Sequence, residues 1–303
     1  MKNQIDGDKK IWTILEIINW TTSYFKSLEI ETSRMDAEIL LAYVLNIKRI
    51  DLYLNYDKPL LANELNSFKT LIIRRKEKEP IAYIIGAKEF WSMEFTVTKD
   101  VLIPRPDTEI LVEAAVAAIK KIKDKGKLKI LELGVGSGAV ISTIAFSAPD
   151  NIFFGTDICK KALNIAKQNG KKHNLKINFF LSDWFSAFKE KKVKFDIIIS
   201  NPPYIPTEDI QGLAPEIKLY EPVSALDGGG NGLDSVNKII SDARFYLNKN
   251  GLLLLEIGFD QKKRVFDMVN SKEEYENPVC LKDYGGNNRV VIVKKIHRYK
   301  DTE

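Results

Sequence analysis

The feature that most constrains the fold is an alternation of short apolar runs with helical stretches in the second half of the chain. Seven runs have the length and the β-branched or aromatic content of strands: Lys129–Leu133, Ile152–Thr156, Ile177–Leu181, Phe195–Ser200, Leu252–Ile257, Val279–Lys282 and Val290–Lys294. Segments with helical periodicity separate most of them. Strands that alternate with helices predict an α/β fold, in which a mostly parallel sheet is covered by helices on both faces.

The last two predicted strands differ from the others in how they are joined. Only Asp283 to Arg289 separates them, and this is too short for the helical crossover that connects two parallel strands. We therefore expect the final strand to be antiparallel.

The first third of the chain follows other patterns. From Ile11 to about Glu79 the apolar spacing predicts a small helical bundle. From Glu89 to Ile103 aromatic and polar residues alternate, which predicts a β-hairpin with Lys99-Asp100 as its turn. Arg105 lies between two prolines in extended backbone, where it either binds a carboxylate or is solvated.

Composition restricts the class of protein. The 303 residues are 45% hydrophobic and 29% charged, as in an ordinary globular protein, and the formal charge of +5 comes from lysines spread along the chain. Cys159 and Cys280 are far apart and the two histidines stand alone, so we expect no metal site. With no signal-peptide core at the start and no run long enough to span a bilayer, we expect a cytoplasmic protein without a membrane partner.

A glycine-rich turn follows the first predicted strand. Gly134-Val135-Gly136-Ser137-Gly138 leads directly into a helix, so its backbone can approach a ligand closely and aim N–H groups at it. Asp157 follows the second strand, where a carboxylate can accept hydrogen bonds from ribose hydroxyls. A dinucleotide-binding fold has the same features, so the turn indicates a ligand that contains adenosine without saying which.

The fourth predicted strand ends in Asn201-Pro202-Pro203-Tyr204. The prolines remove two N–H donors and fix the backbone, which leaves the Asn201 side-chain oxygen and a neighbouring carbonyl as rigid acceptors. Such a pair suits a planar NH2 group. The alternative is a proline-stiffened turn that leaves a core strand, and the motif alone does not decide between the two.

Three observations favour S-adenosylmethionine over a dinucleotide. Hydride transfer has no use for the acceptor pair at Asn201, and an antiparallel final strand is foreign to the dinucleotide fold. Asp183 and Trp184 follow the third strand, where they can bond and stack an adenine. For Trp184, a place in the hydrophobic core is an equally good interpretation.

With these residues assembled, the chain resembles the bacterial release-factor glutamine methyltransferases, the HemK/PrmC family, along nearly its whole length. The most specific similarity is the combination of Ile103-Pro104-Arg105-Pro106-Asp107-Thr108-Glu109 with Asn201–Tyr204. Further similar stretches are Pro80–Gly86, Phe90-Trp91, the glycine turn, Ser182–Phe185, Pro215-Glu216, Tyr220–Pro222, Gly285-Gly286 and Arg289. Two positions depart from the family pattern: Asn231 and Glu132 stand where Asp is usual.

The resemblance implies a Rossmann-like class I S-adenosylmethionine-dependent methyltransferase domain at 107–303, with a seven-stranded, mostly parallel sheet. A substrate-recognising helical bundle at 1–85 and a β-hairpin linker at 86–106 would precede it. The implied substrate is the glutamine of the Gly-Gly-Gln motif in class 1 peptide chain release factors, methylated at N5. Asn201, Pro202 and Tyr204 would be catalytic and, with Pro203, would bind the substrate. The cofactor would contact Gly134, Val135, Gly136, Ser137, Gly138, Asp157, Asp183, Trp184 and Asn201.

Three other functions fit parts of these observations. A sister family with the same motifs methylates a glutamine of a ribosomal protein. A nucleic-acid N-methyltransferase would need a basic recognition domain, and the predicted bundle has little basic clustering besides Arg74-Arg75-Lys76. A sensor of an adenosine ligand would bind without turnover. We expect an enzyme that acts on a protein, as a monomer.

Overall fold

The computed structural model describes residues 11–122, 126–188 and 192–296. The outer ends of the expected first and last domains, 1–10 and 297–303, lie outside these ranges. The chain separates into two compact units, Met1–Ile85 and Gly86–Glu303.

The first unit is a helical bundle, as the sequence predicts. Its helices are α1 (Ile14–Ser27), α2 (Ser33–Leu45), α3 (Arg49–Leu54), α4 (Ala62–Lys76) and α5 (Ile81–Ile85). They bury an apolar cluster that includes Ile14, Ile18, Phe25, Leu40, Leu41 and Phe68. A buried ion pair joins α4 to α2, with Arg75 Nε 2.7 Å from Asp36 Oδ2. Because each charge has a partner, the pair avoids the cost of an isolated buried ion.

A β-hairpin opens the second unit. Strands β1 (Ala87–Phe90) and β2 (Met93–Thr96) are antiparallel, and the turn is Trp91-Ser92. The turn predicted at Lys99-Asp100 is therefore wrong. Both turn residues have positive φ, 55° and 56°, a conformation that Asn-Gly usually signals and Trp-Ser does not. The Trp91 N–H donates to Glu109 Oε1 at 3.0 Å, which stabilises the turn from outside the hairpin.

A seven-stranded sheet forms the centre of the second unit. Its strands are β3 (Lys129–Leu133), β4 (Ile152–Asp157), β5 (Ile177–Leu181), β6 (Phe195–Ser200), β7 (Leu247–Glu256), β8 (Val279–Lys282) and β9 (Asn288–Lys294). The spatial order is β5-β4-β3-β6-β7-β9-β8. Of the seven strands, β9 alone runs opposite to the others, which confirms the predicted antiparallel final strand. The strand order reverses beside β3, where open α/β sheets bind their ligands.

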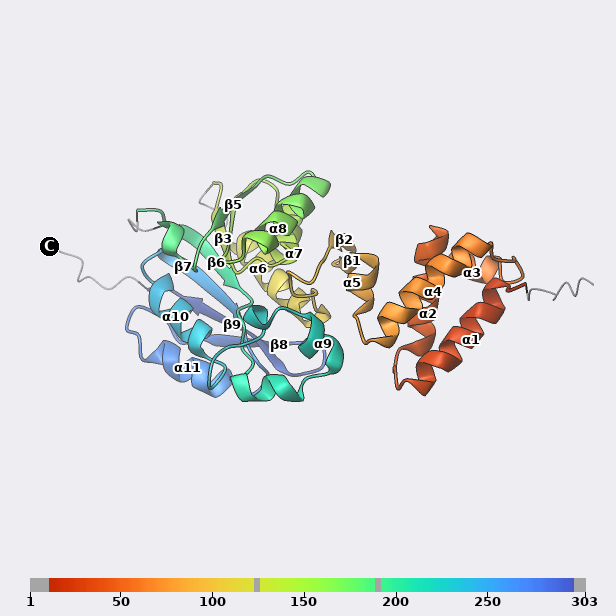
Figure 1. Ribbon diagram of the computed structural model, residues 1–303. Helices are drawn as coiled ribbons and strands as arrows, with labels where there is room; N and C mark the ends of the chain where they lie inside the picture. Colours follow the sequence, from red (N-terminus) through yellow and green to blue (C-terminus); the bar gives the residue numbers. More distant parts are fainter. Residues whose placement is uncertain (1–10, 123–125, 189–191, 297–303) are drawn as a thin grey trace, which may run out of the picture. The chain divides into compact units, whose positions relative to one another are not determined.

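Helices cover both faces of this sheet (Figure 1). One apolar core contains residues of α6 (Glu109–Lys121), α7 (Ala139–Ser147), α8 (Lys160–Lys172) and the hairpin. The other contains residues of α10 (Asp234–Ala243) and α11 (Lys262–Asn270). All six residues of β6 are buried, and its successive isoleucines alternate between the two cores. The short α9 (Pro215–Tyr220) lies in the long β6–α10 connection.

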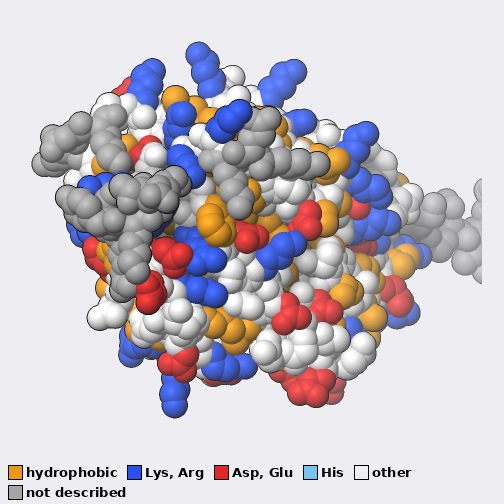
Figure 2. Space-filling model, turned by 90° about the vertical axis from the view of Figure 1, so that its left-hand side faces the viewer, with side chains coloured by type: hydrophobic (Ala, Val, Ile, Leu, Met, Phe, Trp, Pro, Cys, Tyr) orange, Lys and Arg blue, Asp and Glu red, His pale blue; other side chains and the backbone are white. Residues whose placement is uncertain are grey.

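The surface carries charges of both signs. On the face drawn in Figure 2, Lys and Arg side chains lie at several separate places, with Asp and Glu side chains between many of them. Among the helices that the structure describes, none combines the length and the apolar character needed to cross a bilayer.

At Gly138, the residue before α7, the backbone approaches α8 closely. Its φ is 76°, and an added Cβ would lie 3.0 Å from the Cβ of Ala166. We expect Gly138→Ala to lower the free energy of unfolding by about 1–3 kcal/mol, from backbone strain and overpacking together. Urea denaturation measures this loss.

Gly286 provides the matched control, because its φ is 83° but nothing lies within 4 Å of an added Cβ. Gly286→Ala should cost only the strain of the backbone, about 1 kcal/mol. Equal losses in the two variants would mean that the approach of α8 does not require the glycine.

Candidate active site

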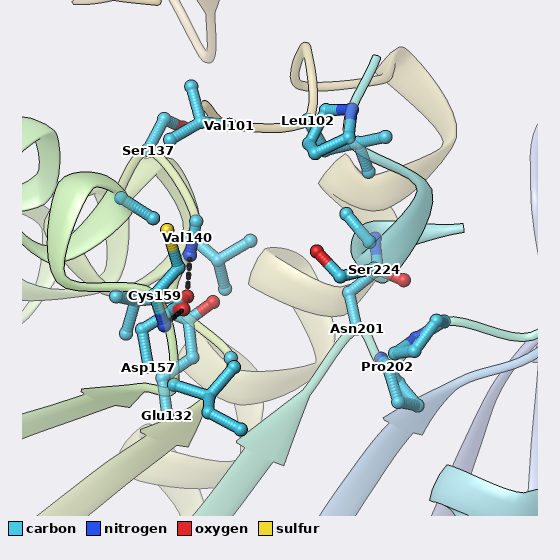
Figure 3. Close-up of a pocket in the computed structure, with 18 of the residues that line it drawn as sticks. Val101, Leu102, Glu132, Ser137, Val140, Asp157, Cys159, Asn201, Pro202 and Ser224 are labelled. Atoms are coloured by element: carbon cyan, nitrogen blue, oxygen red, sulfur yellow. Dashed lines mark hydrogen bonds between the residues drawn. The ribbon is translucent and has the colours of Figure 1, made fainter. Parts of the chain in front are cut away.

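A pocket of about 330 Å³ opens at the carboxyl ends of the central strands. Figure 3 shows Glu132 and Asp157 on one side of it, and Asn201 and Pro202 facing them from the other. The register of the sheet explains this arrangement, because Leu133 pairs with both Thr156 and Ser200. The residues that follow these three therefore emerge together at one edge. They are Gly134, Asp157 and Asn201.

The glycine turn is held in place from β4. The N–H groups of Gly134 and Val135 both donate to the Thr156 carbonyl, at 2.8 and 2.9 Å. Gly134, Val135, Gly136 and Ser137 line the pocket, whereas Gly138 is not among its lining residues. A Cβ on Gly136 would meet no protein atom within 4 Å, so the backbone there is open to a ligand.

Asp157 is the carboxylate that organises this side of the pocket. Its two oxygens each accept a backbone N–H, from Gly136 at 2.9 Å and from Cys159 at 2.8 Å (Figure 3). Burial raises its pKa, and these N–H groups oppose that shift. Each carboxylate oxygen keeps further acceptor capacity, so Asp157 can still accept from ribose hydroxyls as the sequence suggests.

Asp183 and Trp184 both line the pocket after β5. The Asp183 carboxylate is half exposed and pairs with Lys238 Nζ at 3.0 Å. Trp184 also packs against the second apolar core, and its indole would lie 3.7 Å from a Cβ on Gly134. Trp184 therefore packs against the core, as one sequence interpretation expects, and also lines the pocket, where the predicted ligand contact would form.

Asn201, Pro202 and Pro203 line the opposite side. The Asn201 Nδ2 donates to Thr108 Oγ1 at 3.3 Å. Its Oδ1 has no hydrogen-bond partner within the ranges that the structure describes, so an acceptor is left free beside the pocket. Tyr204 is not a lining residue; its hydroxyl donates to Glu256 Oε1 at 3.4 Å.

Arg105 has a specific partner, which the sequence could not identify. Its guanidinium pairs with the buried carboxylate of Glu221, which also accepts the Ile103 N–H at 3.2 Å. The segment around Pro104 and the loop around Pro222 both line the pocket. The pair therefore ties together two parts of the pocket wall that are far apart in the chain.

The charge of the pocket separates the two cofactor interpretations. Five acidic side chains line it: Asp100, Glu132, Asp157, Asp183 and Asp227. Asp100 and Asp183 pair with Lys161 and Lys238, and burial raises the pKa of Glu132, so Asp157 and Asp227 are the acidic groups of this set without an ion-pair partner among the described residues. Arg105 is the single cation among the described lining residues, and Glu221 already neutralises it. A pyrophosphate would meet like charge here, whereas a sulfonium or ammonium group would meet the opposite charge. The site therefore fits a cationic adenosine ligand better than a dinucleotide.

Three residues in or behind the pocket wall were not predicted as site residues from the sequence: Glu132, Glu256 and Thr108. Glu132 is fully buried, its pKa is raised well above the usual range by burial, and it accepts the Ile141 N–H at 2.9 Å. The sequence signal that could have identified it is an acidic residue inside an apolar strand. Glu256 gives the same signal at the end of β7, where burial raises its pKa to about 7. Thr108 has no such signal.

Asn231, which stands where the family pattern has Asp, has a structural role. Its side-chain oxygen accepts the Leu233 N–H at 3.0 Å, two residues on, in the turn before α10. Asn and Asp both form this turn, so the departure does not alter the pocket. In the part of the chain that the structure describes, no group of three or more His, Cys, Asp or Glu residues is placed to hold a metal ion.

Known proteins match both units. The family model for the PrmC N-terminal domain matches residues 16–86, and the model for the methyltransferase small domain matches residues 108–233. A release factor glutamine methyltransferase of Geobacter sulfurreducens is 38% identical over 93% of this chain and 96% of its own length. A release factor glutamine methyltransferase of Buchnera aphidicola is 42% identical over 93% of this chain and 100% of its own length. A methyltransferase of known structure from Pyrococcus furiosus is 17% identical, with a TM-score of 0.49 over 76% of this chain and 98% of that chain.

The raised pKa of Glu256 predicts how stability depends on pH. Its pKa is about 7 in the folded chain and lies near 4.5 in a solvated one, so the folded state holds the proton more tightly. Stability should therefore fall as the pH rises from about 4.5 to about 7. For one group this loss is on the order of 3 kcal/mol.

In Glu256→Gln this loss should be absent. Between pH 5 and pH 8, the unfolding free energy of wild type should therefore fall relative to that of the variant. The comparison isolates Glu256, because the other groups titrate alike in both proteins. Denaturation with urea at the two pH values measures the shift. Parallel pH dependence in the two proteins would contradict the assignment.

Proposed function

Because the chain belongs to the family of release factor glutamine methyltransferases, we propose that it methylates the N5 nitrogen of the Gly-Gly-Gln glutamine in class 1 release factors. The carboxylate-lined pocket, with a free amide oxygen on its far side, is the observation that carries this proposal. The cofactor is S-adenosylmethionine, which supplies a methyl group already activated by a positively charged sulfur.

The residues of one side of the pocket fit this cofactor. Gly134 to Ser137 offer open backbone, Asp157 has acceptor capacity for ribose, and Trp184 presents an aromatic face. Asp183, the preceding residue, would accept a hydrogen bond from the adenine. Gly138 stays a predicted cofactor contact, although close packing against Ala166 already accounts for it.

The other side of the pocket would orient the substrate amide. The free Asn201 Oδ1 and the Pro202 carbonyl would accept its two N–H bonds, with Pro203 keeping the backbone rigid. The lone pair of an amide nitrogen is delocalised, so orientation toward the methyl group is the main task of the protein. Tyr204, held by Glu256, would support the amide from behind.

These two acceptors also favour the transition state. As the nitrogen attacks, positive charge develops on it and its N–H bonds become better donors. Hydrogen bonds that strengthen in this way accelerate the reaction rather than merely bind the substrate. The methylated nitrogen is acidic enough to lose its proton to water, so the mechanism assigns no general base.

The first unit would supply a second surface for a protein substrate. Several of its apolar side chains are well exposed, among them Trp20, Tyr43 and Tyr53. This supports the proposal that the bundle recognises the release factor. We also propose that the protein acts as a monomer in the cytoplasm, where Cys159 and Cys280 would stay reduced.

Mass spectrometry of the substrate tests the function. Incubation of a class 1 release factor with this protein and methyl-labelled S-adenosylmethionine should add one methyl group, on the Gly-Gly-Gln glutamine. A release factor with that glutamine replaced by alanine serves as the control and should gain none. Label on a ribosomal protein or a nucleic acid, with none on the release factor, would contradict the proposal.

Asn201→Ala tests the acceptor. Loss of Oδ1 should lower kcat/KM by an amount that corresponds to about 2–4 kcal/mol of lost transition-state stabilisation. Asn237→Ala, at an exposed position of α10, is the control and should keep wild-type activity. Turnover of Asn201→Ala within about threefold of wild type would remove Asn201 from the mechanism.

A further inference from the structure

Glu256 and Asn201 are neighbours because of the register of the sheet. Strands β6 and β7 are parallel, with Ser200 opposite Leu255. The next residue of each strand, Asn201 and Glu256, therefore leaves the sheet at the same level. Asn201 lines the pocket, whereas Glu256 is buried behind it.

Thr108 connects the two residues. It is buried at the start of α6, and its Oγ1 accepts from Asn201 Nδ2. Its hydroxyl also lies near enough to the Glu256 carboxyl group to lower the pKa of that group. Glu256 also accepts from the Tyr204 hydroxyl. One buried carboxyl group thus contacts, directly or through one hydroxyl, two side chains of the Asn201–Tyr204 motif.

The direction of these hydrogen bonds determines how the Asn201 amide is oriented. A carboxylate can only accept, so Thr108 must donate its one proton to Glu256. The Thr108 oxygen then offers only a lone pair to Asn201, which must face it with the NH2 end. The amide oxygen is consequently turned away from Thr108 and stays free for the substrate.

We propose that Thr108 and Glu256 are positioning residues that fix the Asn201 side-chain amide with Oδ1 available to the substrate. This inference rests on the proposed function for its role in catalysis, while the orientation itself is a property of the chain alone. Neither residue touches the reacting atoms in this account.

Protonation of Glu256 would remove the constraint. A neutral carboxyl group can donate to Thr108, which can then donate to Asn201 Oδ1 and favour the reversed amide. The charged and titratable groups that face Glu256 are Tyr204, Arg289 and Asp107, besides the Thr108 hydroxyl. Burial keeps Tyr204 protonated by raising its pKa, and Arg289 is paired with Asp283 and Asp107 at 3.0 and 3.1 Å.

Thr108→Val removes the hydroxyl at nearly constant shape. We expect kcat for the release factor to fall on the order of tenfold or more, with S-adenosylmethionine affinity unchanged. Thr108→Ser restores the hydroxyl and should recover kcat to within about threefold of wild type. Equal activity of the Val variant and wild type would overturn the positioning role, as would a Ser variant no better than Val.

Glu256→Gln separates positioning from a merely structural role. Gln can donate or accept toward Thr108, so it leaves the direction of the bonds undetermined. We expect wild-type kcat to rise between about pH 6 and pH 8, and the variant to have lower kcat at pH 8 without this rise. Parallel pH profiles in the two proteins would contradict the proposal.

NMR tests the orientation without any substrate. The side-chain NH2 resonances of Asn201, assigned by their loss in Asn201→Ala, should shift with pH around a midpoint near 7 in wild type. The shift should be absent in Glu256→Gln and Thr108→Val. If wild type shows this titration but does not methylate the release factor, the proposed function fails and the positioning role stands. Resonances that do not titrate in wild type would overturn the positioning role alone.

Discussion

The site depends on one alignment of the parallel strands. Leu133, Thr156, Ser200 and Leu255 form a row across β3, β4, β6 and β7. The residues that follow them are Gly134, Asp157, Asn201 and Glu256. The glycine turn, the proposed ribose carboxylate, the proposed substrate acceptor and the buried carboxyl group therefore follow neighbouring strands along one edge of the sheet. A slip of one residue in any strand would turn its functional side chain to the other face of the sheet, so the buried faces that fix the register also fix the chemistry.

The two sides of the pocket differ in the charge of the groups that line them. Carboxylates gather on the side of the glycine turn, where they favour a cation and disfavour phosphate. The Asn201 side presents neutral acceptors, which suit an amide that gains positive charge only as it reacts. Behind that side, Arg289 forms ion pairs with Asp107 and Asp283, and its positive charge also lowers the pKa of Glu256.

Local patterns predicted most of the fold, and several residues that they singled out line the pocket, Asp157 and Asn201 among them. The alternation of strands with helices predicted the parallel sheet, and the short Asp283–Arg289 connection predicted the antiparallel β9. The Trp91-Ser92 turn was missed because its positive φ values are imposed by tertiary contacts such as the one with Glu109. The roles of Thr108 and Glu256 could not be predicted, because each depends on a partner far away in the chain.

The central claim is that Asn201 Oδ1 and the Pro202 carbonyl together hold the substrate amide. The most direct measurement is a crystal structure of this protein with a Gly-Gly-Gln peptide and S-adenosylhomocysteine. The account predicts that the glutamine Nε2 lies within about 3.2 Å of both oxygens. A glutamine whose nitrogen donates to other groups, or whose oxygen faces Asn201, would contradict it.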